Sequence, residues 1–325
     1  MESQFNSSTI VATSPDSLKA PKKRREVHYG DRLFAGSLKA SALGLVVVLG
    51  AIAFFLGNRA WPAFQKFGMS FVSSQAWDPV QELFGALPVV YGTLVSSFLA
   101  ILIATPLSIG IALFLTEMAP RRVSQVVGFL VEMLAAIPSV VYGLWGIFVL
   151  APWLRTSVEP LLGQVLGFLP LFQGPPYGVG MLAAGIILAI MILPTVSSLS
   201  REVFKSIPQA QREAAIALGA TRWEVMRLAV LKGAKSGIVG AVILGLGRAL
   251  GETMAVTMVI GNRHEISLSL FAPASTMASI IANEYNEASS DIHMASLVGI
   301  GFLLFMVTFS INSIARLLLM RGGKN

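Results

Sequence analysis

Six long apolar stretches determine what this chain can fold into. Each is about 20 residues long and carries few charges, and a helix of that length spans the roughly 30 Å of hydrocarbon in a bilayer. Charged residues make up 13% of the chain, whereas a soluble domain has about 25%. The sequence therefore predicts an all-α, polytopic membrane protein with six transmembrane helices, for which the lipid bilayer is the main solvent.

The transmembrane helices are predicted from the apolar stretches and from the polar segments that separate them. Their predicted ranges are 34–57, 90–116, 123–150, 178–199, 236–260 and 292–319. Proline and glycine interrupt the chain between the third and fourth helices. An apolar patch in that interval, residues 161–172, is too short to span and is predicted to be a re-entrant or surface helix.

This layout divides the chain into four regions. Residues 1–33 are polar and rich in serine, which indicates a disordered cytoplasmic tail. The first transmembrane helix and an external loop occupy residues 34–89, the transmembrane core occupies 90–316, and a short cytoplasmic tail occupies 317–325. Within the core, residues 200–235 form a polar loop between the fourth and fifth helices.

Lysine and arginine are distributed unevenly between the predicted loops. The N-terminal flank, the loop after the second helix, the 200–235 loop and the C-terminus hold 19 of the 24 basic residues, and the three opposite loops hold 4. Basic residues accumulate in the cytoplasmic loops of membrane proteins, so both termini are predicted to be cytoplasmic. This topology accounts for the net charge of +7, and nucleic acid is not predicted as a partner.

Side chains that enzymes and metal sites require are sparse or scattered. The chain has no cysteine, and its three histidines lack ligand spacing. A nucleotide-binding P-loop needs a glycine, four residues and then Gly-Lys-Ser/Thr, whereas the similar run Gly233–Ser236 has alanine before the lysine. We therefore predict no metal, no cofactor, no nucleotide site and no catalytic residue in this chain.

The polar loop 200–235 has the pattern of two short helices. Apolar residues recur at helical spacing on both sides of Gly219, and a glycine at this place is typical of the residue just after a helix C-terminus. Thr221 and Glu224 have the spacing of a capping box for a second helix. The loop is predicted to be a helix–turn–helix on the membrane face, and from the residues alone it is either a docking element or a surface connection between two spans.

Two charges, Arg248 and Glu252, lie inside the predicted fifth helix. Arg248 follows Ser236 by twelve residues, about 18 Å along a helix, which predicts a position near the middle of the bilayer. Inserting an arginine there costs about 2.5–3.5 kcal/mol, so its side chain is expected to face protein or water. Glu252 follows four residues later, within reach of an ion pair on the same helical face.

Two interpretations of these charges remain open from the residues alone. Either Arg248 and Glu252 form an internal ion pair that locks helices together, or Arg248 offers its guanidinium to an anion while Glu252 holds it in place. The planar guanidinium suits phosphate oxygens. Glu132 is the other ionisable residue inside a predicted span, and it is either a second partner of Arg248 or a residue near the cytoplasmic interface.

The run Glu213-Ala214-Ala215, followed after three residues by Gly219, resembles the coupling-loop signature of ABC importer permeases. The resemblance implies the type I ABC importer permease fold and a short helix, with Glu213, Ala214, Ala215 and Gly219, that docks onto a cytoplasmic ATPase. The family pattern continues with an isoleucine, any residue and Leu-Pro. Here Leu231 matches, while Ala229 and Lys232 replace the isoleucine and the proline.

Two further motifs narrow the resemblance. The run Gly247-Arg248-Ala249-Leu250-Gly251-Glu252-Thr253-Met254-Ala255-Val256 resembles the fifth-helix motif of phosphate ABC importer permeases, and Ala136-Ile137-Pro138-Ser139-Val140-Val141-Tyr142-Gly143 resembles their third-helix motif. The resemblance covers residues 91–316. The long N-terminal region is similar to that of the PstC-type rather than the PstA-type subunit.

This resemblance implies a bacterial inner-membrane subunit of an ATP-driven phosphate importer. Its expected partners are a second permease of the PstA type, a dimer of ATPase subunits of the PstB type and a periplasmic phosphate-binding protein of the PstS type. Arg248, Glu252 and Glu132 are the residues expected to line the substrate path. The alternatives are a permease for another oxyanion, such as molybdate or sulfate, an ATP-independent secondary transporter, and a membrane enzyme.

Overall fold

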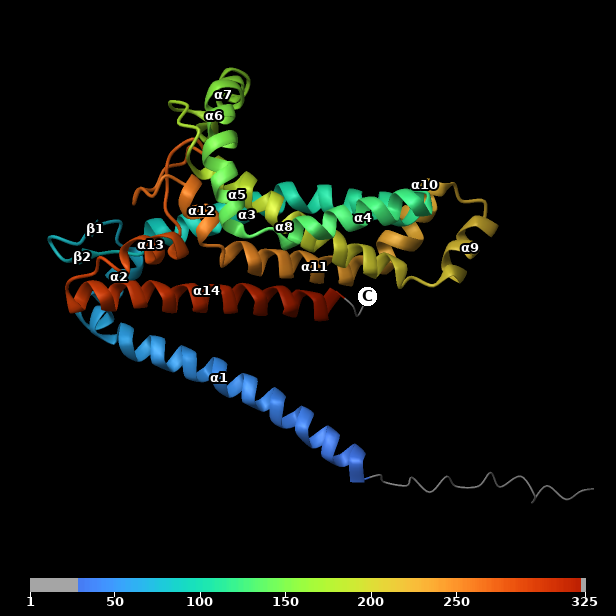
Figure 1. The fold of residues 1–325 in the computed structure, drawn as a ribbon, viewed down its shortest axis with the longest axis horizontal. Helices are drawn as coiled ribbons and strands as arrows, with labels where there is room; N and C mark the ends of the chain where they lie inside the picture. The colour runs from blue at the N-terminus through green and yellow to red at the C-terminus, as the bar shows by residue number, and fades with distance from the viewer. Residues whose placement is uncertain (1–28, 323–325) are drawn as a thin grey trace, which may run out of the picture. The chain divides into compact units, whose positions relative to one another are not determined.

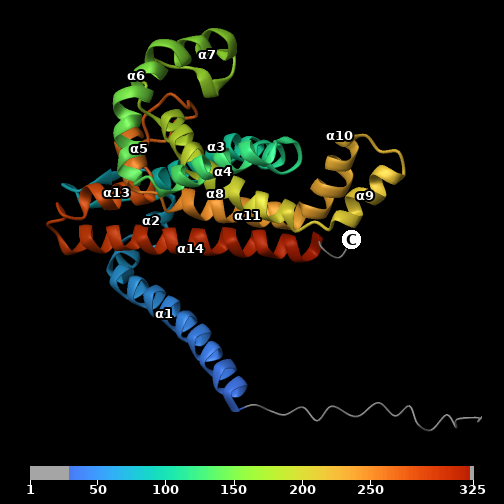
Figure 2. The same cartoon turned by 45° about the vertical axis from the view of Figure 1, so that its right-hand side comes forward.

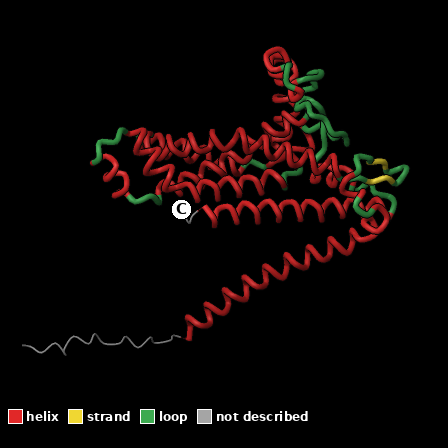
Figure 3. The backbone as a smooth tube through the Cα atoms, turned by 180° about the vertical axis from the view of Figure 1, so that it is seen from behind, coloured by secondary structure: helices red, strands yellow, loops and turns green. Residues whose placement is uncertain are grey.

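The computed structural model describes residues 29–322 and consists almost entirely of helices (Figures 1 and 3). The predicted disordered tail, residues 1–33, lies mostly outside the described residues. The chain divides into two compact units, residues 1–51 and 52–325. The first unit contributes the N-terminal part of the first helix, and the features discussed below belong to the second.

The elements follow one another along the chain with few long loops. The α-helices are α1 (Tyr29–Phe67), α2 (Ser70–Ser73), α3 (Leu87–Leu113), α4 (Arg121–Ala136), α5 (Ser139–Trp145), α6 (Ala151–Trp153), α7 (Glu159–Leu166), α8 (Met181–Lys205), α9 (Gln209–Ala217), α10 (Arg222–Val225), α11 (Lys232–Leu250), α12 (Met254–Val259), α13 (Met277–Glu284) and α14 (Asp291–Gly322). Four π-helical segments, Phe114–Met118, Gly146–Leu150, Leu154–Val158 and Met226–Leu231, continue neighbouring α-helices, and Pro170–Phe172 is a 3-10 turn. The strands β1 (Trp77–Asp78) and β2 (Leu83–Phe84) form an antiparallel pair in which Trp77 lies opposite Phe84.

The structure confirms six helices that are long and apolar enough to cross a membrane. They are Arg32–Phe67, Leu87–Met118, Ser139–Leu166, Met181–Lys205, Arg222–Leu250 and Asp291–Leu317. All six overlap the predicted ranges, and the first, second, fourth and sixth agree best with them. The third and the fifth are displaced from their predicted positions, and each displacement has a local cause.

The predicted third span, residues 123–150, is wrong because the chain breaks at Ile137–Pro138. Ile137 is extended, with φ −67° and ψ 128°, as expected for a residue whose helical conformation clashes with the proline ring that follows. The helix that begins at Ser139 then continues through two π-helical segments to Leu166. The apolar patch predicted as a separate helix at 161–172 therefore begins inside the third span, and α4 precedes that span as a separate helix.

The predicted fifth span, residues 236–260, is wrong at both ends. A continuous helix begins at Arg222 and ends at Leu250, so the span includes part of the predicted polar loop. Glycines at 245, 247 and 251 weaken helix propensity in this region. After Leu250 the residues Gly251, Glu252 and Thr253, which we call the α11–α12 break, are not helical, and α12 is a separate short helix.

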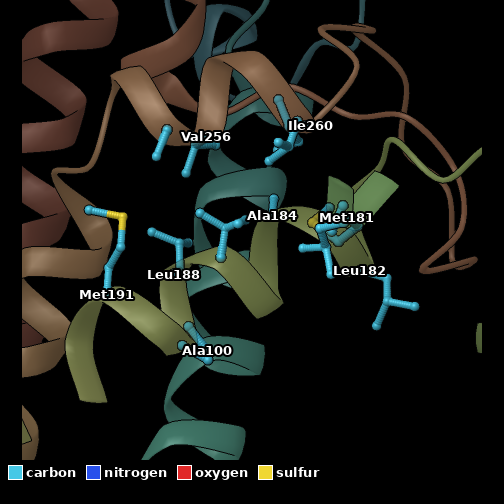
Figure 4. Close-up of a cluster of buried hydrophobic side chains, with 14 of the residues drawn as sticks. Ala100, Met181, Leu182, Ala184, Leu188, Met191, Val256 and Ile260 are labelled. Carbon is cyan, nitrogen blue, oxygen red and sulfur yellow. The ribbon is translucent and has the colours of Figure 1, made fainter. Parts of the chain in front are cut away.

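Helix α8 lies at the centre of the largest hydrophobic core (Figure 4). Its side chains Met181, Leu182, Ala184, Leu188 and Met191 are buried together with Ala100 of α3 and with Val256 and Ile260 from the α12 region. Burial on all sides suits a helix that other spans surround. The consequence is that α8 provides a packed reference surface for both α3 and α11.

The two ends of this helical bundle have different structures (Figure 1). Helices α9 and α10 lie at one end, close to the C-terminal end of α14, while β1, β2, α2 and α13 lie at the other. Helices α5, α6 and α7 run in a different direction from the layer of α3, α8 and α11 (Figures 1 and 2). We call the end that carries α9 and α10 the α9 end, and the end that carries β1 and β2 the β-hairpin end.

Candidate functional site

Arg248 lies in the last turn of α11, directly before the α11–α12 break. Its distance from the start of the continuous helix at Arg222 is roughly 39 Å at 1.5 Å per residue, so it is near the end of this helix rather than at its middle. Gly245, one turn earlier, lies so close to α8 that an added Cβ would be 2.7 Å from Cγ2 of Val196. This close approach places Arg248 beside α8.

Within the described part of the chain, the guanidinium of Arg248 has one hydrogen bond, in which Nη1 donates to Oγ1 of Thr195 on α8 at 3.1 Å. Glu252 does not take part, because the helix that would bring it to the same face ends at Leu250. Its Oε1 instead accepts from the backbone N–H of Ala255 at 3.3 Å. Of the two interpretations that the residues left open, the internal ion pair between Arg248 and Glu252 is therefore not formed, and within residues 29–322 Arg248 has no carboxylate partner.

Glu132 lies elsewhere, on α4, outside the six membrane-spanning helices. Its Oε1 is 3.8 Å from Nη1 of Arg201, and 59% of its side chain is exposed. Arg201 also donates to the backbone oxygen of Ser124 at 3.4 Å. The structure thus ties α4 to α8 through Arg201 and does not bring Glu132 to Arg248.

The two sequence motifs of the third and fifth helices meet in the structure. An added Cβ at Gly143 of α5 would lie 3.1 Å from Cα of Ala255 in α12. An added Cβ at Gly146 would lie 2.6 Å from Cγ1 of Val259. The two glycines therefore allow α5 to pack directly against α12, next to the α11–α12 break.

The connection between α8 and α10 has the predicted helix–turn–helix form. Gly219 follows α9 with φ +84°, the left-handed conformation that glycine adopts without strain. Its N–H donates to the carbonyl of Ile216 at 2.9 Å, and the next N–H, of Ala220, donates to Ala215 at 3.1 Å, as in a Schellman motif. Thr221 and Glu224 form the predicted capping box at the start of α10.

Helix α9 is exposed on the side that carries the coupling-loop signature. Glu213 and Ala214 are exposed, and so are the large apolar residues Ile216, Leu218 and Trp223 around them. A set of exposed apolar side chains around one carboxylate is typical of a protein–protein contact rather than of a surface in water. The structure therefore brings Glu213 together with an apolar surface that the sequence reasoning did not identify.

A polar cluster at the β-hairpin end was also missed. Glu284, at the end of α13, accepts from Nε1 of Trp77 at 2.9 Å, its Oε2 lies 3.0 Å from Nε2 of His293, and its Oε1 lies 3.7 Å from Nε2 of His264. The ring of Phe84 stacks on His293. Burial lowers the pKa of His264 below its usual 6.5, and the nearby Glu284 opposes this shift. Among residues 29–322, no group of His, Asp and Glu is arranged to hold a metal ion.

Comparison with known proteins agrees with this architecture. Residues 104–321 match the family described as "binding-protein-dependent transport system inner membrane component". The chain is 51% identical to a phosphate transport system permease protein PstC of Mesorhizobium japonicum over 295 residues, which are 90% of each chain. It is 46% identical to the PstC protein of Pasteurella multocida over 94% of this chain and 97% of that one.

Solved structures of ABC transporters share the fold. A bacterial alginate ABC transporter in complex with its periplasmic protein matches with a TM-score of 0.58 at 16% identity, covering 88% of this chain and 95% of that one. The MetNI methionine ABC transporter in an inward-facing form matches with a TM-score of 0.52 at 18% identity, covering 74% of this chain and 98% of that one. With its six spans, the polar connection at α9 and the matched region 104–321, this chain belongs to the family of binding-protein-dependent transport system inner membrane components.

Proposed function

We propose that this chain is the permease subunit of an ATP-driven importer of inorganic phosphate and forms half of the translocation path. The observation that carries the proposal is Arg248, a cation in a membrane-spanning helix. Among the described residues its guanidinium has one hydrogen bond, to Thr195, which leaves most of its donors without a partner there. The high identity to proteins named as phosphate transport permeases supports phosphate as the anion.

The α11–α12 break supports a substrate path at this point. Backbone that leaves the helix at membrane depth has polar groups that lipid cannot satisfy, so such breaks line cavities or pack against protein. In many transporters, discontinuous helices form the substrate site. Here the break begins at Gly251, three residues after Arg248, which puts a guanidinium next to backbone that has left the helix.

Glu252 has a different role in this proposal from the one that its sequence position indicates. Because its carboxylate accepts from the N–H of Ala255, it orders the start of α12 beside Arg248 rather than neutralising the guanidinium. Glu132 on α4 pairs with Arg201 on α8, so this proposal does not include Glu132 in the substrate path. The candidate contacts to the anion are therefore Arg248 and Thr195.

The partners follow from the exposed surface at α9. We propose that Glu213, Ala214, Ala215 and the turn at Gly219 dock onto a cytoplasmic ATPase dimer, which would place the α9 end and both termini in the cytoplasm of a bacterial inner membrane. The distribution of basic residues supports this orientation. A second, homologous permease completes the path, and a periplasmic phosphate-binding protein delivers the anion at the β-hairpin end.

The mechanism in this proposal is alternating access without covalent chemistry in this chain. Closure of the ATPase dimer pushes on α9, and the continuous helix from Arg222 to Leu250 carries the movement towards Arg248. The guanidinium then contacts the anion from one side of the membrane and releases it on the other. This helix runs without interruption from α10 through the π-helical segment Met226–Leu231 to α11, so one element joins α9 to Arg248.

Transport by the reconstituted complex tests the proposal. The complex is purified through this chain, incorporated into liposomes with its binding protein, and supplied with ATP and labelled phosphate. We expect uptake that depends on ATP and that sulfate, molybdate and tungstate do not inhibit at equal concentration. Uptake of one of these oxyanions in preference to phosphate would identify a different oxyanion importer, and uptake without ATP would identify a secondary transporter.

A further inference from the structure

A partly buried ion pair connects α9 to the second membrane-spanning helix. Nη2 of Arg212 lies 3.0 Å from Oε1 of Glu117, and only 19% and 15% of the two side chains are exposed. Glu117 belongs to the π-helical segment Phe114–Met118 that ends this span. The two residues are 95 positions apart in the sequence, so this contact joins two elements that the chain connects only at long range.

The pair lies on the inner side of α9. Arg212 and Glu213 are neighbours, but Glu213 is exposed whereas Arg212 is largely covered. Nη2 of Arg212 also donates to the backbone oxygen of Phe204, at the end of α8, at 2.8 Å. One guanidinium therefore contacts the ends of two spans, while the adjacent carboxylate faces outward.

A small hydrophobic cluster lies between the elements that this pair joins. Ala112 of α3, Phe204 of α8, Val230 and Ala234 are fully buried together. Tight apolar packing transmits displacement because it has low compressibility. By contrast, the ion pair is directional, so it holds α9 in register with the end of the second span.

We infer that the Arg212–Glu117 pair is a positioning element of transport, through which movement of α9 reaches the second span. This inference rests on the proposed function, because it requires an ATPase that moves α9. Without the pair, α9 remains joined by the backbone to α8 and to the helix that begins at Arg222. Force would then reach the second span only through the apolar packing around Ala112, without the directional contact that holds α9 in register with it.

The absence of cysteine from the chain allows a direct test of this route. Leu102→Cys on α3 and Leu244→Cys on α11 introduce single exposed labelling sites, since these side chains are 59% and 60% exposed. Each is labelled with an environment-sensitive fluorophore in the assembled complex, and the change in emission on adding ATP and vanadate is measured. The background is varied with Glu117→Gln, Arg212→Gln and Arg212→Lys.

We expect Glu117→Gln and Arg212→Gln to reduce the response at position 102 at least about fivefold, the lower range of couplings between linked sites, while the response at 244 is kept. Arg212→Lys retains the charge and should retain most of the response. Lys205→Gln removes the exposed pair of Lys205 with Glu202 and serves as the matched control without effect. Phosphate transported per ATP should fall in parallel with the response at position 102.

The outcomes separate this inference from the proposed function. An unchanged response at position 102 in both glutamine variants would overturn the inference, and so would release of the ATPase by both, which would show that the pair only maintains the structure. If the wild-type labels respond but phosphate is not transported, the proposed substrate is wrong and the inference stands. If neither wild-type label responds to ATP, both fail.

Discussion

Glu284 and Arg248 are two charged side chains with opposite surroundings. Glu284 receives hydrogen bonds or close contacts from Trp77, His293 and His264, which belong to three other segments at the β-hairpin end. Arg248 has one hydrogen bond to the residues that the structure describes, and its partner is Thr195. A charge with several partners holds segments together. A charge with few partners in a membrane-spanning helix has lost its contacts with water without replacing them, and an anionic ligand can offset that free-energy cost.

This comparison separates structural charges from functional ones in a membrane protein. Both residues are partly covered by neighbouring side chains, so burial does not distinguish them. The number and type of their partners does. It follows that removing Glu284 should reduce stability with little direct effect on anion transport. Removing Arg248 should reduce anion transport with little effect on stability.

Arg248→Ala gives the largest expected effect. If Arg248 contacts the anion, its loss costs about 2–5 kcal/mol, so transport should fall at least 30-fold, while the complex stays assembled and its melting temperature stays unchanged. Arg248→Lys is the matched variant, which keeps the charge but loses the planar fork and should be intermediate. The measurements are phosphate uptake and thermal unfolding in detergent. Normal uptake by the alanine variant would assign Arg248 to structure and remove the contrast.

Glu284→Ala should act on stability. Hydrogen bonds to a charged group contribute about 1.5–3 kcal/mol, and several are lost here, so we expect the melting temperature of the purified protein to fall by about 5 °C. Glu287→Gln, which changes an exposed carboxylate in the same region, is the control without effect. A melting temperature equal to the wild-type value would show that the cluster does not hold the β-hairpin end together.

Thr195→Val removes the hydroxyl that accepts the hydrogen bond from Arg248 and keeps the shape of the side chain. Because Thr195 orients the guanidinium without contributing a charge, we expect a three- to tenfold weaker apparent affinity for phosphate, about 1 kcal/mol, at an unchanged maximal rate. Thr116→Val is the control, since the hydroxyl of Thr116 bonds only within its own helix, to Ala112 and Leu113. Equal affinities in the two variants would mean that Thr195 does not position Arg248.

Local features of this fold were predictable from the sequence, and contacts between distant segments were not. Six apolar stretches predicted six spans, and Gly219 and Thr221 predicted a turn and a cap, because these features depend on neighbouring residues. Hydrophobicity hid the break at Pro138, since the residues on both sides are apolar. The local rule for the residue before proline was the signal that would have located it.

The partners of the charges depend on packing that spacing does not encode. Arg248 contacts Thr195, 53 residues away, because Gly245 allows α11 to approach α8. The i+4 spacing of Arg248 and Glu252 allowed an ion pair only if the helix continued, and the helix ends between them. Trp77 and Glu284 are 207 residues apart, and nothing in either local sequence indicates the other.

The smallest expected effect is a pH dependence at the β-hairpin end. Because burial lowers the pKa of His264 below 6.5 in the folded protein, the unfolded chain binds more protons between that lowered value and 6.5. Stability is therefore fully present above pH 6.5 and falls as the pH drops through this window. The groups that face His264 are Glu284 and Trp77, and Glu284 in turn contacts His293.

His264→Gln removes this titration. Between pH 7.5 and 5.5 we expect the melting temperature of the wild-type protein to fall by about 1–2 °C more than that of the variant. Glu82→Gln is the control, which removes a carboxylate instead of an imidazole. The hydrogen bond from Lys66 holds the pKa of Glu82 below 4.5. The contribution of Glu82 to stability is therefore fully present above pH 4.5 and does not change between pH 7.5 and 5.5. If wild type and His264→Gln have parallel pH profiles, the buried imidazole does not titrate with unfolding, and the stability of the Glu284 cluster is insensitive to pH between 7.5 and 5.5.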